Sequence, residues 1–262
     1  MKLNQKLVQR LLFCVTPLVT GSVFVALPGF AASEAISGSQ VEITNFSHNP
    51  QDTSTFTDTK TFTNVDLSET YSSGSLPPFG IVSTTGDALA VFPLTPSSSN
   101  TQAFNATLST AQGDGVGYLG VSQSFAQVTG YNFSVGAGET FSFDTKAFLG
   151  VQTSTSNQYE NASSFGNISF LLFDSNDMKN PLDFFSVSAQ VSNESDDFLK
   201  VSKSADLNFE PTNVALDTST GSNNENILAS FQGTFSRLFE KLTNLTFVEV
   251  KTNAVAVSCP LR

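Results

Sequence analysis

Hydrophobic and polar residues alternate along much of this chain with a period of two residues. In Thr140–Val151, apolar residues or threonine take every second position, and mostly polar residues lie between them. The same alternation runs through Phe185–Val191 and Ala229–Phe235. Because successive side chains of a strand point to opposite faces of a sheet, each run predicts a strand with one buried and one solvent-facing side. This pattern is typical of antiparallel sheets covered on one face.

Further segments rich in β-branched and aromatic residues also predict strands. They are Val41–Ser47, Thr53–Val65, Phe79–Val91, Gln102–Thr110, Tyr118–Val135, Asn167–Phe173, Leu199–Phe209 and Leu245–Ser258. Turns are predicted at Gly136–Gly138 and Asp174–Asp177. We therefore expect an all-β fold, an antiparallel jelly-roll-like β-sandwich of roughly ten strands.

Two regions depart from this alternation. An apolar spacing of i, i+3, i+4 and i+7 joins Phe235, Leu238, Phe239 and Leu242. A short amphipathic helix is as good an expectation there as a strand. In Asp66–Thr101 the periodicity is weakest and prolines are frequent, which predicts long loops around one strand.

Residues 1–31 have the layout of a secretory signal peptide. A basic start precedes the almost wholly apolar run Leu11–Leu27, and small residues for cleavage follow in Phe30–Ser33. An uncleaved anchor is the alternative, but the run is short for a bilayer crossing of about 20 residues, and Pro17 interrupts it. We expect cleavage near Ala31, export from the cytoplasm, and a single β-sandwich domain over residues 32–262.

The composition makes this domain strongly acidic. Three of the 12 basic residues and none of the 23 acidic residues lie in the signal segment, so nine bases and 23 acids leave a formal charge of −14. Phosphate backbones and anionic lipid would repel such a chain, which argues against nucleic-acid or membrane partners. After residue 31, no stretch approaches the roughly 18 consecutive apolar residues needed to span a bilayer.

Cys259 is the one cysteine that signal cleavage would leave. It has no intramolecular partner, so the core must stabilise the fold without a disulfide. Because it lies three residues before the last residue printed, we expect an exposed, reactive thiol, and a possible disulfide dimer through Cys259.

Catalysis that depends on histidine is restricted to His48, the single histidine of the sequence. A Ser-His-Asp or Cys-His arrangement would have to use it as general base. Its setting, Asn45–Pro50, predicts a turn residue at the end of the first strand instead, and a zinc site with several His or Cys ligands is excluded by count.

Paired carboxylates would suffice for glycoside hydrolysis. Sugar-binding clefts, however, use aromatic platforms, and this chain has no tryptophan and four tyrosines. It has 25 phenylalanines, 22 of them after residue 31, and many of these fall on the buried periodicity, which favours a core role. Exposed Phe or Tyr in a row on one sheet face would favour a carbohydrate-binding module.

Two acidic turns are candidates for calcium, which prefers several oxygen ligands. One contains Asp174, Asn176 and Asp177, and the other contains Glu194, Asp196 and Asp197. Neither has EF-hand spacing, and polar acidic turns are the ordinary way to end strands. Metal binding therefore stays open.

Four segments carry strand and turn patterns on which a family resemblance rests. They are Val41–Ser47, Tyr131–Asp144, Gly166–Ser175 and Phe247–Lys251. Together they resemble the PEP-CTERM-type exported β-sandwich proteins of cyanobacteria. The resemblance implies a secreted domain of unknown activity, often a surface or extracellular-matrix component, and carries no catalytic residues.

The sequence departs from that family after its last predicted strand. Members end in a Pro-Glu-Pro signal, an apolar crossing and a basic tail, whereas this sequence ends in Cys259–Arg262 without the C-terminal sorting tail. We therefore expect a diffusible protein, extracellular or periplasmic, or one retained by binding another surface component.

The leading hypothesis is a secreted, non-enzymatic β-sandwich protein with a structural or interaction role at the cell surface or in the matrix. The partner is an unknown surface component, or a glycan. The alternative is a carbohydrate-binding module, and the second alternative is a carboxylate-dependent hydrolase. The sequence assigns no catalytic or cofactor-binding residue.

Overall fold

The structure, a computed structural model, describes residues 33–65, 80–94, 103–193, 197–219 and 223–260. Their order is β1 Ser33–Thr44, β2 Asp52–Val65, β3 Ile81–Val91, β4 Ala103–Asp114, β5 Tyr118–Val135, β6 Glu139–Thr155, β7 Asn161–Asp174, β8 Asp183–Ser192, β9 Phe198–Lys203, β10 Asn208–Ser219, β11 Asn224–Phe239 and β12 Thr243–Cys259. The described residues form strands, turns and irregular segments, without a helix. The predicted signal peptide and most of the predicted loops in Asp66–Thr101 lie outside these ranges.

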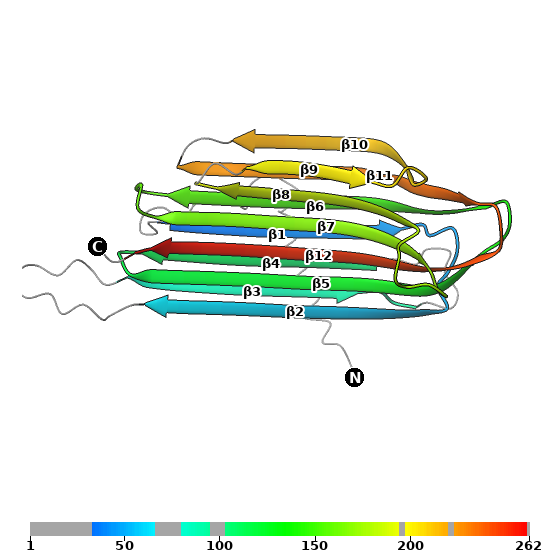
Figure 1. Ribbon diagram of the computed structural model, residues 1–262, viewed down its shortest axis with the longest axis horizontal. Helices are drawn as coiled ribbons and strands as arrows, with labels where there is room; N and C mark the ends of the chain where they lie inside the picture. Colours follow the sequence, from blue (N-terminus) through cyan, green and yellow to red (C-terminus); the bar gives the residue numbers. More distant parts are fainter. Residues whose placement is uncertain (1–32, 66–79, 95–102, 194–196, 220–222, 261–262) are drawn as a thin grey trace, which may run out of the picture. The chain divides into compact units, whose positions relative to one another are not determined.

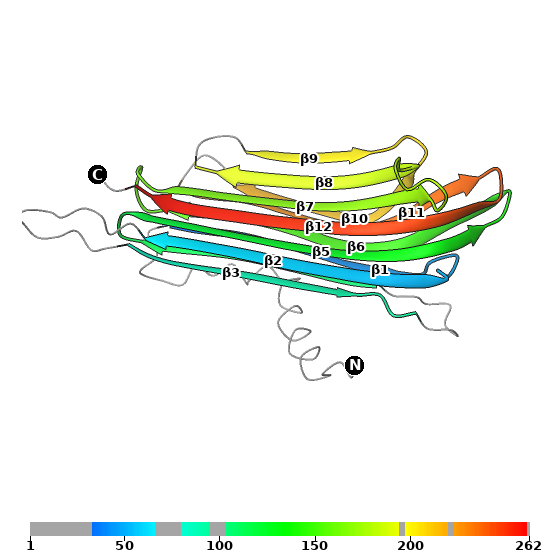
Figure 2. The same cartoon turned by 60° about the horizontal axis from the view of Figure 1, so that its bottom comes forward.

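The twelve strands form two antiparallel six-stranded sheets. Sheet A has the order β10-β11-β6-β1-β4-β3, and sheet B has the order β2-β5-β12-β7-β8-β9. In Figures 1 and 2 the strand axes of the two sheets are nearly aligned, although neighbouring strands point in opposite directions, and sheet B lies over sheet A. This is the aligned packing of a β-sandwich. The predicted all-β fold with two antiparallel sheets is confirmed.

One predicted strand is in fact two. Leu199–Phe209 is divided between β9 at the edge of sheet B and β10 at the edge of sheet A. Between them the chain leaves one sheet and enters the other, and the Lys203 ammonium donates to the carbonyl of Leu207 across the bend at 3.1 Å. An alternating pattern cannot show such a crossing, because the alternation continues on either side of it.

Of the two expectations for Phe235–Leu242, the strand is confirmed as far as Phe239 and the short helix is wrong. β11 continues to Phe239 and pairs with β6 along its whole length, for example Arg237 with Phe141. Phe235 and Phe239 face the core, whereas Leu238 is 62% exposed and Leu242 is 69% exposed. The helical spacing therefore arises from two inward phenylalanines and two leucines that face solvent.

Most of the interior is a phenylalanine cluster, in which rings from both sheets meet. It includes Phe46, Phe133, Phe141, Phe143, Phe170, Phe185, Phe235 and Phe247. Ring centroids lie 5.0 Å apart for Phe143–Phe247 and 4.8 Å apart for Phe185–Phe235. A second apolar group, here the alanine–valine cluster, contains Ala35, Ala111, Tyr118, Ala162, Val255, Val257 and Cys259.

Candidate functional site

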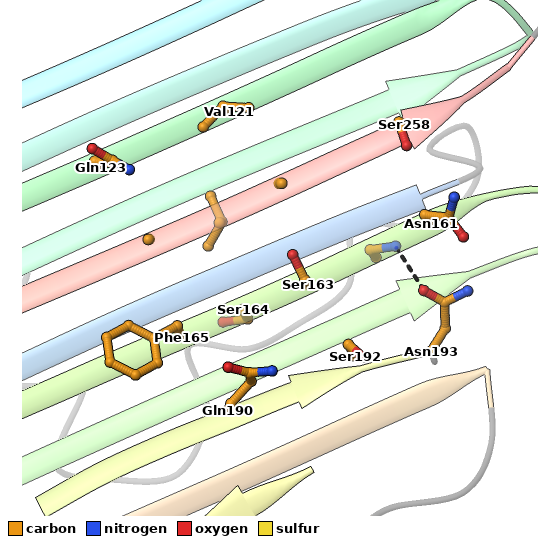
Figure 3. Close-up of a pocket in the computed structure, with 14 residues that line it drawn as sticks. Val121, Gln123, Asn161, Ser163, Ser164, Phe165, Gln190, Ser192, Asn193 and Ser258 are labelled. Carbon is orange, nitrogen blue, oxygen red and sulfur yellow. Dashed lines mark hydrogen bonds between the residues drawn. The ribbon is translucent and has the colours of Figure 1, made fainter. Parts of the chain in front are cut away.

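A groove on the outer face of sheet B is the largest hollow that we describe on this fold. It has a volume of about 500 Å³, and Figure 3 shows its lining on β5, β7, β8 and β12. Its lining residues include Val121, Gln123, Ser163, Phe165, Gln190, Ala254, Ala256 and Ser258. We call it the outer groove.

The groove follows from the sizes of neighbouring side chains. β12 lies at the centre of sheet B and places Ala254 and Ala256 on the outer face, where they leave a low floor. Ala254 is paired with Gln123 on one side and with Phe165 on the other, and Phe165 is paired with Gln190. The longer side chains of these three residues form the walls.

The lining is neutral. Its residues are alanines, valines, serines, asparagines, glutamines and one phenylalanine, with no acidic or basic side chain among them. Asn193 closes one end, where its amide accepts from the Ala162 backbone at 2.9 Å and donates to the Glu160 carbonyl at 2.8 Å. The outer groove thus has hydroxyl and amide groups and one aromatic ring for a polar, uncharged ligand, but no general acid or base.

Most of the described phenylalanines lie in the core, and those that are exposed lie on strands of sheet B. Eleven described phenylalanines are buried, in agreement with the predicted core role. Four are exposed: Phe56 and Phe62 on β2, Phe184 on β8 and Phe198 on β9. Phe56 contacts the ring of Phe125 on β5, with centroids 5.7 Å apart. Sheet B therefore presents aromatic surface on both sides of the outer groove.

A second hollow, of about 330 Å³, brings carboxylates together on sheet A. Its lining includes Glu42, Asp144 and Lys146. Asp144 is already bonded through both oxygens, to the Asn45 amide at 2.7 Å and to the Thr234 hydroxyl at 2.5 Å. This hollow therefore places two carboxylates, Glu42 and Asp144, in one lining.

His48 lies in the bend after β1, as predicted, but near two groups that the sequence did not suggest. Its Nε2 is 3.2 Å from Glu139 Oε2, and its Nδ1 is 2.9 Å from Ser47 Oγ. The Ser47 hydroxyl also accepts from the backbone N–H of Ser142 at 2.8 Å. The backbone N–H of Gly136, and then His48, lower the pKa of Glu139. These bonds attach the bend to the start of β6, so the three side chains have a structural explanation.

The acidic turn after β7 bonds to itself. Asp174 Oδ1 accepts from both the backbone and the side chain of Asn176, at 2.9 and 3.0 Å, and Asp177 accepts from the Lys179 backbone at 3.2 Å. Of the other acidic turn, Asp197 accepts from the Ser192 backbone at 2.9 Å, while Glu194 and Asp196 lie outside the described residues. Within the described ranges, no group of three His, Cys, Asp or Glu residues is placed to hold a metal ion.

Cys259 is buried, so the prediction of an exposed thiol is wrong. Its side chain is 4% exposed and packs in the alanine–valine cluster. The end of β12 does not fray because Cys259 is paired with Tyr118 on β5, and the Gly117 N–H donates to its carbonyl at 2.8 Å. A disulfide between two chains would require the thiol to leave this cluster first.

Sequence reasoning missed a polar belt inside the sandwich, between the two apolar clusters. Its members come from β1, β4, β5 and β12: Ser37, Ser39, Asn105, Thr107, Ser109, Ser124, Glu249, Lys251 and Asn253. Along the inner face of β12, Leu245 and Phe247 belong to the phenylalanine cluster, the next three inward residues are polar, and Val255 and Val257 belong to the alanine–valine cluster. The belt therefore crosses the interior from one sheet to the other.

Asn253 joins the sheets within this belt. Its amide donates to Ser37 Oγ at 2.6 Å, and its oxygen accepts from Ser39 Oγ at 2.8 Å and Thr107 Oγ1 at 2.7 Å. Ser109 and Ser124 form a further cross-sheet bond at 2.8 Å. These contacts satisfy polar groups that would be costly to bury alone.

Glu249 and Lys251 are both fully buried in the belt. Lys251 Nζ donates to Glu249 Oε1 at 2.6 Å, and Asn105 Nδ2 is 2.5 Å from Glu249 Oε2. Burial raises the pKa of Glu249 and lowers the pKa of Lys251 to about 8. We call this group the Asn105–Glu249–Lys251 triad. Lys and Glu are rarely found fully buried, yet in the sequence they occur as ordinary polar residues of a predicted strand.

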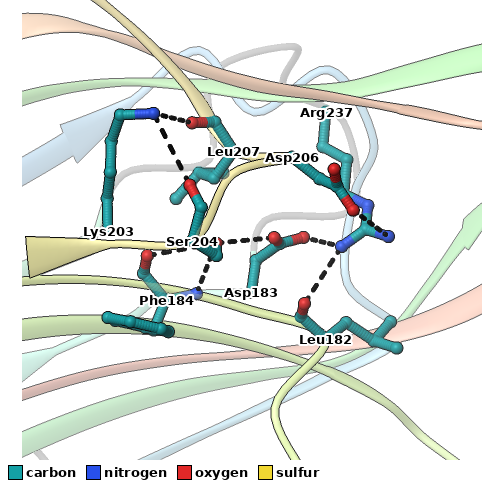
Figure 4. A network of polar contacts seen from close by, with 8 residues as sticks. All are labelled: Leu182, Asp183, Phe184, Lys203, Ser204, Asp206, Leu207 and Arg237. Carbon is teal, nitrogen blue, oxygen red and sulfur yellow. Dashed lines mark hydrogen bonds and ion pairs between the residues drawn. The ribbon is translucent and has the colours of Figure 1, made fainter.

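A second buried charge lies where the sheets meet near the start of β8 (Figure 4). Arg237 of β11 forms an ion pair with Asp183 and donates to the Leu182 carbonyl at 3.2 Å. Ser204, after β9, donates to the same Asp183 carboxylate at 2.6 Å. Burial lowers the pKa of Arg237, whose guanidinium also lies 4.9 Å from the centroid of the Phe239 ring. The group connects β11 of sheet A to β8 of sheet B.

Searches for relatives gave no family. No protein-family model matches the chain, and no curated protein matches it. Among the residues that the structure describes, no helix is long and apolar enough to cross a membrane.

Proposed function

We propose that this is a secreted, non-enzymatic β-sandwich protein with a structural or interaction role at the cell surface or in the extracellular matrix. The observation that carries the proposal is the neutral lining of the outer groove. A groove without an ionisable side chain can hold a ligand but offers no acid or base for proton transfer. Aromatic side chains on both sides of it enlarge the surface available for contact.

A glycan is the ligand class that best fits the groove, which makes a carbohydrate-binding module the second candidate. Sugars offer many hydroxyl groups to amides such as Gln123 and Gln190, and an apolar ring face to a side chain such as Phe165. The carboxylate-dependent hydrolase is supported only by the shared hollow of Glu42 and Asp144.

The finer features expected from the sequence remain part of this proposal. They are the signal peptide at residues 1–31, the PEP-CTERM-type resemblance, and the jelly-roll-like strand arrangement. The last is supported by repeated passage between sheets, as in β4–β5, β5–β6 and β6–β7. A formal charge of −14 after signal cleavage favours partners other than nucleic acid and anionic membranes.

The test is glycan-array binding of the purified protein, with and without calcium, for the wild type and two matched variants. Ala256→Arg fills the outer groove, whereas Val250→Arg places the same side chain on the same strand outside the lining. We expect at least a tenfold loss of binding in Ala256→Arg and none in Val250→Arg. Equal binding by both variants would remove the groove from the proposal. If the wild type binds no glycan, the carbohydrate-binding candidate is wrong.

The structural role needs a separate measurement, by fractionation of the native cells. We expect the protein in the periplasm, the medium or a salt-washable matrix fraction. Recovery only after detergent extraction would contradict a secreted protein.

A further inference from the structure

We propose that Lys251 and Asn105 become joined by an isopeptide bond, formed within the chain and assisted by Glu249. The bond would link β12 of sheet B to β4 of sheet A through the interior. It is a modification site that does not depend on the proposed function.

The first argument is the arrangement of the triad. One carboxyl group, that of Glu249, bridges an amine and a carboxamide, with 2.6 Å to Lys251 Nζ and 2.5 Å to Asn105 Nδ2. The three side chains are at most 1% exposed. An amine and an amide bound to the same carboxyl group, away from water, are held with the high effective concentration that an intramolecular reaction requires.

The second argument concerns the unused hydrogen-bonding capacity of the triad. Within the described residues, Asn105 Oδ1 is buried without a partner, and Lys251 Nζ has one hydrogen bond. An ammonium group has three donors, so the charged form of Lys251 is poorly satisfied here. A neutral amine beside a neutral carboxylic acid leaves fewer groups unsatisfied, and burial shifts the pKa values of Glu249 and Lys251 in these directions.

The third argument is the short contact between Asn105 and Glu249. A separation of 2.5 Å is short for an N–H···O bond but normal for O–H···O. Because amide oxygen and nitrogen can exchange places by rotation, Asn105 can turn its oxygen toward a protonated Glu249. That hydrogen bond would polarise the carbonyl and make its carbon a better electrophile.

The reaction needs no other reactant. The neutral amine of Lys251 attacks Cγ of Asn105, so that the Nζ–Cγ bond forms and the Cγ–Nδ2 bond breaks. Glu249 passes the proton lost by Nζ to Nδ2, which leaves as ammonia. The products are a secondary amide and one ammonia, and Glu249 is regenerated as an acid.

Asn253 is the other buried carboxamide near Lys251, and its hydrogen bonds argue against it as the group that Lys251 attacks. Both ends of its amide are occupied, by Ser37 on one side and by Ser39 and Thr107 on the other. The two acceptors can be distinguished, because a modified Lys251 is not cleaved by trypsin. A bond to Asn253 would then stay within residues 242–262, whereas a bond to Asn105 would join that segment to residues 61–146.

The test is denaturing mass spectrometry of the purified full chain, its amino terminus fixed by sequencing, followed by tryptic mapping. We expect a mass lower than the sequence mass by one ammonia, no cleavage after Lys251, and segments 61–146 and 242–262 joined. Complete separation of these segments in the wild type, with cleavage after Lys251, would show a plain ion pair and overturn the proposal. Loss of ammonia without joined segments would also overturn it.

Two variants separate the chemistry from folding. Glu249→Gln keeps the size of the side chain but cannot transfer the proton, so we expect complete loss of the joined peptide in chains with wild-type circular dichroism. Asn253→Ala is the matched control in the same belt and should retain the joined peptide. A joined peptide in Glu249→Gln would refute the role of Glu249. Because the wild-type map decides the bond itself, a variant that fails to fold leaves the proposal falsifiable.

Discussion

The phenylalanine cluster and the polar belt lie in the same interior, between the same two sheets, and are stabilised in different ways. In the cluster, rings such as Phe143 and Phe247 pack without directional bonds. In the belt, Asn253 makes cross-sheet hydrogen bonds at 2.6 to 2.8 Å. Apolar burial contributes most of the stabilisation of folding and tolerates small shifts. Hydrogen bonds contribute less on balance but are costly when broken, so the belt fixes which residues of the two sheets face each other.

The largest expected effect is in the phenylalanine cluster. Phe143→Ala should lower the free energy of unfolding by about 3–5 kcal/mol, because it removes a ring that contacts five others and leaves a cavity. Urea denaturation measures the change. Phe56→Ala, at a site 57% exposed, is the control and should cost about 0.5 kcal/mol or less. Similar losses in both variants would mean that the cluster is not the main source of stability.

A somewhat smaller loss is expected in the belt. Asn253→Ala leaves Ser37, Ser39 and Thr107 without their shared partner, and should cost about 2–3 kcal/mol. The control is Thr85→Ala, which removes an exposed bond to Thr110 and should cost less than about 1 kcal/mol. The same denaturation experiment applies. If Asn253→Ala behaves like its control, the belt does not specify how the sheets meet.

The smallest effect is a pH dependence at the other end of the interior. Tyr118, in the alanine–valine cluster, bonds to Ser33 Oγ at 2.7 Å, and burial raises its pKa to about 12. The folded state therefore keeps the phenolic proton between pH 10 and about 12, where the unfolded chain loses it. Stability from this group is complete below pH 10 and is lost as pH rises through about 12. The free energy of unfolding of the wild type should therefore fall between pH 8 and pH 11 relative to that of Tyr118→Phe, which has no phenolic proton to lose. A difference between the two proteins that is the same at both pH values would contradict this origin.

The sequence predicted the cluster far better than the belt, and the reason is local. Alternation in Thr140–Val151 marks its inward face because phenylalanine, leucine and valine differ clearly from their neighbours. In β12 the inward positions 249, 251 and 253 are Glu, Lys and Asn, whereas Val248 and Val250 point outward. A rule that assigns polar residues to solvent and apolar residues to the core therefore predicts the wrong face as buried in this part of the strand.

Partners distant in the sequence explain the other differences. Asn105 and Glu249 are separated by 144 residues, so no spacing in the sequence relates them. The burial of Cys259 depends on its pairing with Tyr118, and the strand at Arg237 depends on pairing with β6. The outer groove depends on small residues of β12 lying between longer ones on β5 and β7, which only the strand order determines.

The place of β12 in sheet B has a consequence for the order of folding. A ribosome makes the chain from its amino terminus, so β12 is the last of the described strands to be synthesised, yet it lies between β5 and β7. Until residues 243–259 are available, the two halves of sheet B, β2-β5 and β7-β8-β9, have no strand to join them. Such long-range pairing is slow and leaves strand edges open to other chains in the meantime. We expect the nascent protein to depend on a chaperone until its final strand is inserted.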